Sequence, residues 1–344
     1  MIDNNILIKS DNLKALQWLL DNGYENKVDL VYIDPPFATG GTFSIDKNGR
    51  VSTISKSNNS TIAYKDTLQG EEFISFLKER VVLIHRLLSD RGSFYLHIDY
   101  KIGHYVKVML DEVFGMKNFR NDITRIKCNP KNFDRIGYGN IKDLILFYTK
   151  GANPIWNDPR IPYSAEEVIN GYPKIDKNGR RYTTVPIHAP GESKTGDTAK
   201  AFKGILPPAG RHWRCSIAEL EALDAAGRIE WSANGNPRKI NYADEMRGKK
   251  AQDIWEFKDP TYPEYPTQKN EDMLKFIIEA SSLENSIVLD CFCGSGSTLK
   301  VANSLNRNWI GVDMSDLAIQ VTRRRLNSSN LFSVNEEPYF YIEI

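Results

Sequence analysis

The segment Val28–Phe37 constrains the fold of this 344-residue chain more than any other stretch. Val28–Ile33 is an apolar run with several β-branched residues, and such a run predicts a buried strand. The two prolines that follow Asp34 cannot donate ladder hydrogen bonds, so the strand must end there. Asp34 and Phe37 therefore stand at the carboxyl end of a strand, the edge where ligands bind in open α/β sheets. A strand-ending turn with an aspartate cap would have the same sequence, so the functional interpretation depends on a second motif.

Strand and helix patterns alternate over most of the remaining chain. Further strands are predicted at residues 6–8, 93–98, 122–127, 143–148, 287–289, 309–312 and 338–344, of which 122–127 and 143–148 could form a hairpin. Helices are predicted from the helix cap Asp11 to Gly23, from residue 73 to Gly92, over 101–114, and after residues 270, 297 and 313. The alternation predicts a doubly wound α/β fold, with a mainly parallel sheet and helices on both faces. Residues 44–63 are rich in Ser, Thr, Asn and Lys, and they predict a mobile loop.

Residues 151–260 differ from the rest in composition and indicate an inserted domain. They are rich in proline and glycine, hold 17 Lys and Arg against 15 Asp and Glu, and contain no acidic residue from Thr198 to Ala218. Basic residues interleaved with aromatic ones such as Trp213 favour phosphate contact and base stacking, and an ordinary solvated surface is the competing interpretation. The candidate nucleic-acid-binding residues, which become DNA-binding candidates only with the family resemblance given below, are Lys200, Lys203, Arg211, Arg214, Arg238, Lys239, Lys249 and Lys250.

The second motif is Asp290–Thr298, a glycine-rich turn between a predicted strand and a predicted helix. Asp313 ends the following strand, at the position from which an acid binds ribose hydroxyls in nucleotide-binding folds. Leu299 replaces the third glycine of the dinucleotide fingerprint, and no lysine follows the turn as in a phosphate-binding loop. The pattern therefore indicates a cofactor that carries adenosine but no pyrophosphate, and S-adenosylmethionine fits this description.

Together these motifs resemble those of the β-class DNA amino-methyltransferases. Asp34–Phe37 resembles their catalytic motif, (D/N/S)-P-P-(Y/F/W), and Asp290–Thr298 resembles their F-x-G-x-G cofactor motif. Tyr265–Lys269 is similar to their H-P-T-Q-K-P segment, with Tyr in place of His and Asn in place of the last Pro, and Asp253–Trp255 resembles their D-x-W element. The order of catalytic motif, variable region and cofactor motif is that of the β-class.

The resemblance implies a methyltransferase domain with a circularly permuted motif order. Residues 1–150 would form its catalytic half, residues 151–260 an inserted target-recognition region, and residues 261–344 its cofactor-binding half. The implied reaction is site-specific methyl transfer from S-adenosylmethionine to adenine N6 in duplex DNA, with the target base flipped out of the helix. The implied catalytic residues are Asp34, Pro35, Pro36 and Phe37. The implied cofactor-binding residues are Asp11, Thr267, Gln268, Lys269, Asp290, Phe292, Gly294, Ser295, Gly296, Thr298 and Asp313.

Individual roles follow from the resemblance in the same way. Asp313 would hold the ribose, Asp290 would anchor the turn, and Thr267 and Lys269 would hold the carboxylate end of the cofactor. Asp11 would lie near the adenine, and a role as a helix cap is the competing interpretation.

The chemistry of an aromatic amine agrees with this assignment. The lone pair of such an amine is delocalised into the ring, so the nitrogen is a poor nucleophile. Asp34 can accept one N–H and the Pro35 carbonyl the other, and Phe37 can stack on the base, so the protein positions and polarises the amine. Neither a metal nor a nucleophilic side chain is required.

Three alternative functions remain open at this point. Cytosine N4 is also an aromatic amine, although an aspartate at the first motif position is commoner among adenine enzymes of the family. Eukaryotic mRNA adenosine methyltransferases also carry a D-P-P-W motif and a permuted order. A catalytically inactive DNA-binding module is the alternative from another class, and the intact D-P-P-F and G-x-G motifs argue against it.

Composition limits the cellular setting and the partners. The net charge of +1 excludes a generally basic nucleic-acid-binding chain. The N-terminus lacks the pattern of a signal peptide, and no apolar stretch is long enough to span a bilayer. The four cysteines show no disulfide framework. We therefore expect a cytoplasmic protein with reduced thiols. The expected partners are duplex DNA, a second copy of the chain and a cognate restriction endonuclease, and residues 328–344 receive no functional role.

Overall fold

The computed structural model divides the chain into two compact units, Met1–Pro159 with Gln252–Ile344, and Arg160–Ala251. The structure describes residues 5–36, 70–130, 134, 136–233, 235–260, 268–328 and 339–344, together with the backbone of three short strands between residues 42 and 65.

In the described part of the first unit, nine strands form one sheet in the order β17-β7-β8-β6-β2-β18-β19-β1-β20. All neighbouring pairs are parallel except those made by β8, which runs antiparallel to β6 and β7. The strands are β1 (Ile6–Lys9), β2 (Val28–Ile33), β6 (Leu88–Ile98), β7 (Phe119–Ile126), β8 (Lys142–Thr149), β17 (Ile254–Trp255), β18 (Ile287–Asp290), β19 (Asn308–Asp313) and β20 (Phe340–Glu343).

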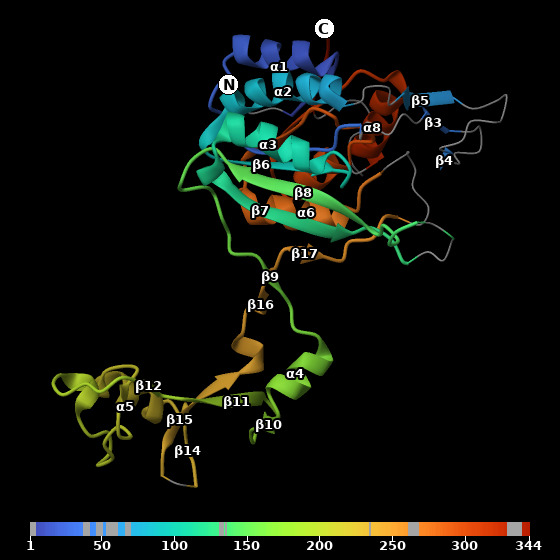
Figure 1. Ribbon diagram of the computed structural model, residues 1–344. Coiled ribbons are helices and arrows are strands. Elements are labelled where there is room, and N and C mark those ends of the chain that lie inside the picture. Colours follow the sequence, from blue (N-terminus) through green and yellow to red (C-terminus); the bar gives the residue numbers. More distant parts are fainter. Residues whose placement is uncertain are drawn as a thin grey trace. The chain divides into compact units, whose positions relative to one another are not determined.

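Helices cover both faces of this sheet (Figure 1). One face packs against α1 (Asn12–Asp21), α2 (Gly70–Leu87) and α3 (Gly103–Phe114), and the other against α6 (Glu271–Ser281), α7 (Ser297–Ser304) and α8 (Asp316–Ser328). The short 3₁₀ helix η1 (Met116–Asn118) follows α3. No helix within the described ranges has the length and apolar character needed to cross a membrane.

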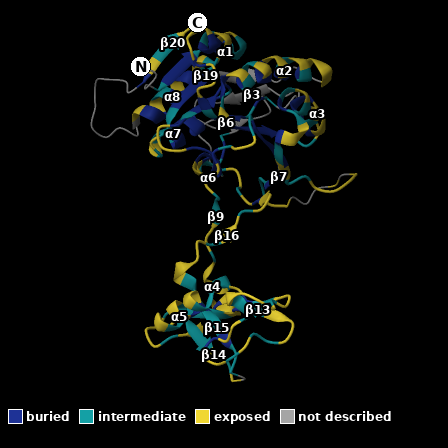
Figure 2. Ribbon diagram, turned by 90° about the vertical axis from the view of Figure 1, so that its left-hand side faces the viewer, coloured by how far each residue is buried: buried dark blue, intermediate teal, exposed yellow. Residues whose placement is uncertain are grey.

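The apolar side chains of each strand alternate between the two faces. In β2, Val31 and Ile33 join the core under α1, α2 and α3, whereas Leu30 and Tyr32 join the core under α6, α7 and α8. A strand that is buried on both faces has a nearly continuous apolar sequence. Figure 2 shows the sheet buried between helices whose outer surfaces are exposed. The predicted doubly wound α/β fold is therefore confirmed.

Most predicted elements match the structure, and one boundary was wrong. The antiparallel pair β7 and β8 confirms the predicted hairpin, and β20 confirms a strand at the C-terminal end. The helix predicted to run to Gly92 ends at Leu87, and β6 begins at Leu88 with a register shift against β2. A Cβ on Gly92 would lie 3.1 Å from the carbonyl oxygen of Val28, so this glycine permits a close backbone approach in an irregular strand instead of ending a helix.

The segment predicted as a mobile loop over residues 44–63 contains strands. The strands β3 (Thr42–Ile45), β4 (Val51–Ser52) and β5 (Thr61–Lys65) form an antiparallel sheet in the order β4-β3-β5. The loop prediction was therefore wrong for these residues, because the polar composition of this segment hid a short antiparallel sheet. The rest of the predicted loop lies outside the described residues.

The second unit combines small antiparallel sheets with short helices. Its sheets have the orders β10-β11-β15-β14, β12-β13 and β16-β9. Its elements are β9 (Arg160–Ile161), α4 (Ala165–Gly171), β10 (Lys174–Ile175), β11 (Arg181–Pro186), β12 (His188–Pro190), η2 (Asp197–Ala199), β13 (Arg211–Trp213), α5 (Ile217–Ala225), β14 (Ile229–Trp231), β15 (Pro237–Tyr242), η3 (Ala243–Glu245) and β16 (Lys249–Lys250). Ile187, Phe202, Trp213 and Leu220 form a small core of its own.

The second unit is shorter than the inserted region expected from composition. Residues 151–159 and 252–260 pack with the first unit, because Asn157 donates a hydrogen bond to the carbonyl oxygen of Glu279 and Trp255 joins the core under α6. Composition therefore overestimated the insertion by one short segment at each end.

Candidate active site

The two sequence motifs meet at one edge of the central sheet. β2 and β18 are parallel neighbours, so Asp34 and the turn after Asp290 both follow carboxyl ends of strands at the same edge. The helix that follows β2 lies on one face of the sheet, and the helix that follows β18 lies on the other. The chain thus changes direction between β2 and β18, and such switch points are where open α/β sheets bind ligands.

Asp34 has one oxygen occupied and one available. Its Oδ2 lies 2.7 Å from Nζ of Lys269, and the side chains of Asp34 and Lys269 are 15% and 10% exposed. Oδ1 is buried and accepts no hydrogen bond from any residue that the structure describes. Pro35 is buried and Pro36 is partly exposed, whereas Phe37 lies outside the described residues. The site therefore presents a buried carboxylate oxygen that is ready to accept an N–H donor.

A buried polar network lies behind Asp34, on the same face of the sheet. Tyr32 Oη and His97 Nδ1 are 2.9 Å apart, and His97 Nε2 lies 3.0 Å from Asp143 Oδ2. The Arg125 guanidinium reaches the same Asp143 oxygen at 3.4 Å, and it also donates to Asp259 Oδ1 at 2.5 Å. Both ring nitrogens of His97 thus have partners, and neither Arg125 nor Asp143 was among the residues predicted from the sequence.

The protonation states in this network follow from its burial. Burial and the nearby Lys269 charge lower the pKa of His97, although Asp143 opposes the shift. Burial alone would raise the pKa of Asp143, but the hydrogen bond from His97 and the charges of Lys127 and Arg125 bring it down to about 2. A neutral His97 beside a carboxylate must carry its proton on Nε2, so Nδ1 accepts a hydrogen bond from Tyr32.

Two aspartates hold the glycine-rich turn. Asp290 Oδ1 accepts a hydrogen bond from the backbone N–H of Phe292 at 3.0 Å, and Thr298 also bonds to this carboxylate. Asp313 accepts hydrogen bonds from the backbone N–H groups of Gly294 and Ser315, each at 2.9 Å. The turn is thus tied to the carboxyl ends of both β18 and β19.

The same aspartates make the site electrostatically unusual. Burial, with smaller contributions from the charges of Asp34 and Asp313, raises the pKa of Asp290 to about 7. Burial also raises the pKa of Asp313. Carboxylates that resist ionisation for lack of solvation favour a positively charged ligand, because such a ligand would stabilise their charged forms.

Arg325 supports the turn from α8, and sequence reasoning missed it. Its buried guanidinium donates to the carbonyl oxygen and the hydroxyl of Ser295, both at 2.8 Å, and to Ser297 Oγ at 3.0 Å. Glu271 of α6 balances its charge at 2.6 Å. Arg325 lies three residues after Thr322, on the side of α8 that is buried. A charged residue at a buried helix position is unusual, and this pattern in the sequence could have identified Arg325 as a functional residue.

Leu299 explains why the third glycine of the dinucleotide fingerprint is absent. That glycine normally allows the helix to pack closely on the strand. Here the glycine is on the strand instead, because a Cβ on Gly311 of β19 would collide with the Leu299 side chain. The helix and the strand therefore still pack closely, with the glycine on the strand and the larger side chain on the helix.

Asp11 serves as the cap of α1. Its carboxylate accepts hydrogen bonds from the backbone N–H groups of Leu13 and Lys14 and from the guanidinium of Arg80 on α2. The helix-cap interpretation is therefore confirmed.

The start of α1 also lies beside the cofactor motif. Asn12, the residue after the cap, donates a hydrogen bond to the carbonyl oxygen of Cys291, and the Phe76 and Phe292 rings lie 6.4 Å apart. Gln268 lies directly before Lys269, in the segment that leads into α6, and Thr267 lies outside the described residues.

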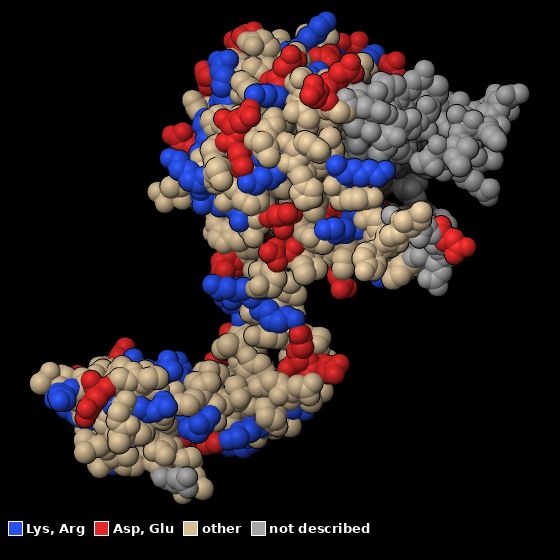
Figure 3. All heavy atoms as spheres, in the orientation of Figure 1, with Lys and Arg blue, Asp and Glu red and all other residues tan. Residues whose placement is uncertain are grey.

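The eight candidate DNA-binding residues of the second unit are five lysines and three arginines. Lys200, Lys203 and Lys249 pair with Asp197, Asp224 and Glu167. Lys250 is exposed on β16, and Lys239 is half-buried on β15. Figure 3 shows Lys and Arg side chains together with Asp and Glu side chains on the surface of this unit.

The three arginines surround His188. Arg211 Nη1 lies 3.2 Å from His188 Nδ1, and Arg214 donates to the His188 carbonyl oxygen at 3.2 Å. Burial, followed by the charges of Arg211, Arg214 and Arg238, lowers the pKa of His188. Trp213, between the first two arginines, is fully buried and cannot stack on a base, so the base-stacking interpretation was wrong for this residue.

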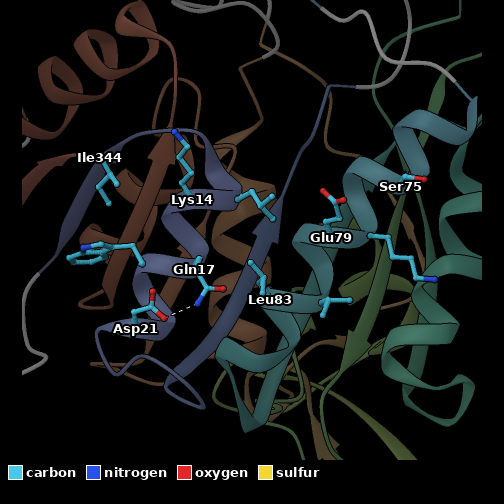
Figure 4. A pocket seen from close by; sticks show the side chains of 11 residues that line it. Lys14, Gln17, Asp21, Ser75, Glu79, Leu83 and Ile344 are labelled. Carbon is cyan, nitrogen blue, oxygen red and sulfur yellow. Dashed lines mark hydrogen bonds between the residues drawn. The ribbon is translucent and has the colours of Figure 1, made fainter.

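A groove between α1 and α2 is separate from this site (Figure 4). Among the described residues that line it, none belongs to the catalytic or the cofactor motif. The lining residues are Leu13, Lys14, Gln17, Trp18, Asp21, Ser75, Lys78, Glu79, Val82, Leu83 and Ile344.

Comparison with known proteins identifies the family. The DNA methylase family model matches residues 28–324. The type II methyltransferase M.EcaI of Enterobacter cloacae is 41% identical over 327 residues, covering 93% of this chain and 69% of the relative. The type II methyltransferase M2.LlaDCHI of Lactococcus lactis subsp. cremoris is 36% identical over 336 residues, covering 96% of this chain and 93% of the relative.

Two further matches are more distant. The chain spans 50% of the StyLTI Mod subunit, a type III restriction–modification protein of Salmonella typhimurium, with 26% identity. The PvuII DNA methyltransferase, a cytosine-N4-specific enzyme of known structure, shares the fold at a TM-score of 0.50 and 14% identity, with 98% of this chain and 95% of that chain covered. The match of the family model over most of the chain and the identity to M.EcaI together show that this chain belongs to the DNA methylase family.

Proposed function

We propose that this protein transfers the methyl group of S-adenosylmethionine to adenine N6 in duplex DNA at specific sites. The observation that carries the proposal is the buried Oδ1 of Asp34, which lacks a hydrogen-bond donor among the described residues at the edge that also holds the glycine-rich turn. An acceptor that is buried without a partner costs about 1–3 kcal/mol, and a substrate N–H would satisfy it.

The residues of the turn fit the proposed cofactor. Gly296 has a left-handed backbone with φ of +71°, and its Cα faces Thr322 closely, so the turn leaves no room for a side chain. Asp290 is buried and Asp313 is partly buried, a positively charged group would stabilise both carboxylates, and Asp313 would hold the ribose. S-adenosylmethionine would supply an electrophilic methyl group on a positively charged sulfur.

The chain's own residues would raise the nucleophilicity of the amine. Asp34 Oδ1 accepts one N–H of the exocyclic amine, and the Pro35 carbonyl accepts the other. These two hydrogen bonds draw the nitrogen towards a tetrahedral geometry, so its lone pair is released from the ring. The base must leave the duplex to reach this buried carboxylate, because the amine is stacked and paired inside the helix.

The choice of adenine rests on the charge of Asp34. A charged acceptor forms a hydrogen bond roughly twice as strong as a neutral one, and an aspartate at this motif position is typical of adenine enzymes. Cytosine N4 is the second candidate, because the same pair of acceptors can polarise either amine and the PvuII enzyme shares the fold.

We expect N6-methyladenine in plasmid DNA that has been treated with the enzyme and then digested to nucleosides. Mass spectrometry of the digest distinguishes the two products directly, and sequencing of the methylated positions gives the recognition site. A parallel reaction with RNA of the same sequence tests whether the enzyme requires DNA as its substrate. N4-methylcytosine without N6-methyladenine would overturn the adenine assignment and support the second candidate.

The second unit is proposed to hold DNA through its arginines. Arg211 and Arg214 are exposed, and neither forms a salt bridge with any residue in the described ranges. Lys200 and Lys203 are equally exposed, but each would first have to leave an acidic partner. Arginines without acidic partners are therefore the better candidates for phosphate contacts.

Replacing Arg211 and Arg214 by alanine should weaken DNA binding and flatten its dependence on salt. The slope of log K against log[salt] should fall by about 0.9 for each phosphate group that the variant no longer neutralises. The matched control is the Lys200→Ala, Lys203→Ala variant, for which we expect a smaller change. Fluorescence anisotropy with a labelled duplex at several salt concentrations measures both, and an unchanged slope in the arginine variant would place the DNA elsewhere.

A restriction–modification role is supported by the names of the relatives, which are type II methyltransferases and type III modification subunits. A cognate restriction endonuclease, a homodimer and a cytoplasmic location are part of the proposal. Co-purification from the source cell and light scattering of the purified protein test the two partners.

A further inference from the structure

We propose that Lys269 is a positioning residue for Asp34, which it orients so that Oδ1 faces the target amine. This inference rests on the proposed methyl transfer but not on the identity of the base. It differs from the role that the family resemblance implies for Lys269, which is to hold the carboxylate end of the cofactor.

The first observation is the contact itself. Lys269 Nζ lies 2.7 Å from Asp34 Oδ2, and both side chains are nearly buried. A charge-assisted hydrogen bond at this distance in a poorly solvated place fixes the rotation of the carboxylate. Since Oδ2 is occupied by Lys269, Oδ1 is the oxygen that can accept a hydrogen bond from a ligand.

The second observation is the state of the other oxygen. Asp34 Oδ1 is buried and, among the described residues, has no hydrogen-bond donor. A carboxylate that was held for structural reasons alone would be expected to have both oxygens satisfied, because buried polar atoms without a partner are rare. One fixed and one open oxygen is the arrangement that an acceptor for a substrate N–H requires.

The third observation is that the backbone of Lys269 is itself held in place. The next residue, Asn270, caps α6 by accepting a hydrogen bond from the backbone N–H of Met273 at 3.0 Å. The Asn270 side chain also donates to the carbonyl oxygen of Lys258 at 2.9 Å. The ammonium therefore projects from a fixed helix start, which makes Lys269 a rigid support for Asp34.

The charge of Lys269 also suits this place. Asp290 lies close enough to Asp34 for the Asp34 charge to raise the pKa of Asp290, so like charges gather at this edge. The Lys269 ammonium beside Asp34 offsets the repulsion between these like charges.

The test is Lys269→Met, which keeps an unbranched side chain that is one atom shorter and removes the charge. We expect turnover at saturating cofactor to fall about 10²-fold, because a displaced catalytic group costs that much. Cofactor affinity measured by calorimetry should change less than about threefold. Lys269→Arg should restore most of the turnover, since it returns a cationic donor to Asp34.

Turnover is measured as tritium transferred to unmethylated genomic DNA, whichever base receives it. Loss of cofactor binding in Lys269→Met, with normal turnover once cofactor is saturating, would show that the lysine holds the cofactor and would overturn the proposal. Failure of Lys269→Arg to recover turnover would also overturn it, provided that the melting temperature matches that of wild type. No transfer by the wild-type protein would instead contradict the proposed function.

Discussion

Replacing Asp34 by alanine should reduce methyl transfer about 10²–10³-fold while cofactor binding and the fold remain. The loss follows because Asp34 Oδ1 is the acceptor that polarises the amine, and removal of one group that stabilises a transition state costs about 10²–10³-fold. Asp34 also lies after the end of β2, outside the apolar core, so the sheet does not depend on it. Single-turnover assays with tritiated cofactor measure the loss.

The matched variant is Asp34→Asn, which keeps the size of the side chain and one neutral acceptor. We expect its turnover to lie between those of Asp34→Ala and wild type, because a neutral acceptor forms a weaker hydrogen bond. Calorimetry with S-adenosylmethionine should give similar affinities for all three proteins. An Asp34→Ala protein with turnover within threefold of wild type would refute the catalytic role of this carboxylate.

Replacing Gly296 by leucine should abolish measurable cofactor binding. The backbone of Gly296 is left-handed, with φ of +71°, and a non-glycine residue in that conformation costs about 1–2 kcal/mol. A Cβ there would also lie 2.7 Å from the Thr322 side chain, which is buried and donates a hydrogen bond to the carbonyl oxygen of Gly294. The turn must therefore move, and affinity weakens about tenfold for each 1.4 kcal/mol by which binding becomes less favourable.

The control for this variant is Gly23→Leu, at the end of α1. Gly23 has a similar φ of +85°, but a Cβ there would meet nothing within 4 Å. It should lose stability without losing cofactor affinity, as calorimetry and thermal melting would show. If Gly296→Leu bound the cofactor as tightly as wild type, the assignment of the turn to the cofactor would fail.

The sequence predicted the frame of the site because that frame depends on local patterns. An apolar run stopped by two prolines defines β2, and a glycine-rich turn between a strand and a helix defines the second motif. In a doubly wound fold both must come to the carboxyl edge of the sheet, so their meeting followed from the alternation of strands and helices.

The partners of the charged side chains could not be predicted in this way. Lys269 lies 235 residues after Asp34 in the chain, and Arg325 lies 30 residues after the serine that it holds. The pairing of charged side chains depends on the strand order and on the direction in which each helix presents its side chains. Local sequence determines neither the strand order nor that direction. The same holds for the second unit, where spacing grouped eight basic residues. In the structure three of the lysines pair with acids, whereas Arg211 and Arg214 have no acidic partner among the described residues.

The sequence by itself thus determined the fold class, the two motifs and the chemistry that they serve. Tertiary structure alone decided that Lys269 contacts Asp34, that Asp34 keeps one oxygen open, and that Arg125 is buried between two aspartates. The physical reason is that secondary structure follows from neighbours along the chain, whereas a buried charge takes its partner from whatever the packed sheet and helices bring within hydrogen-bond distance.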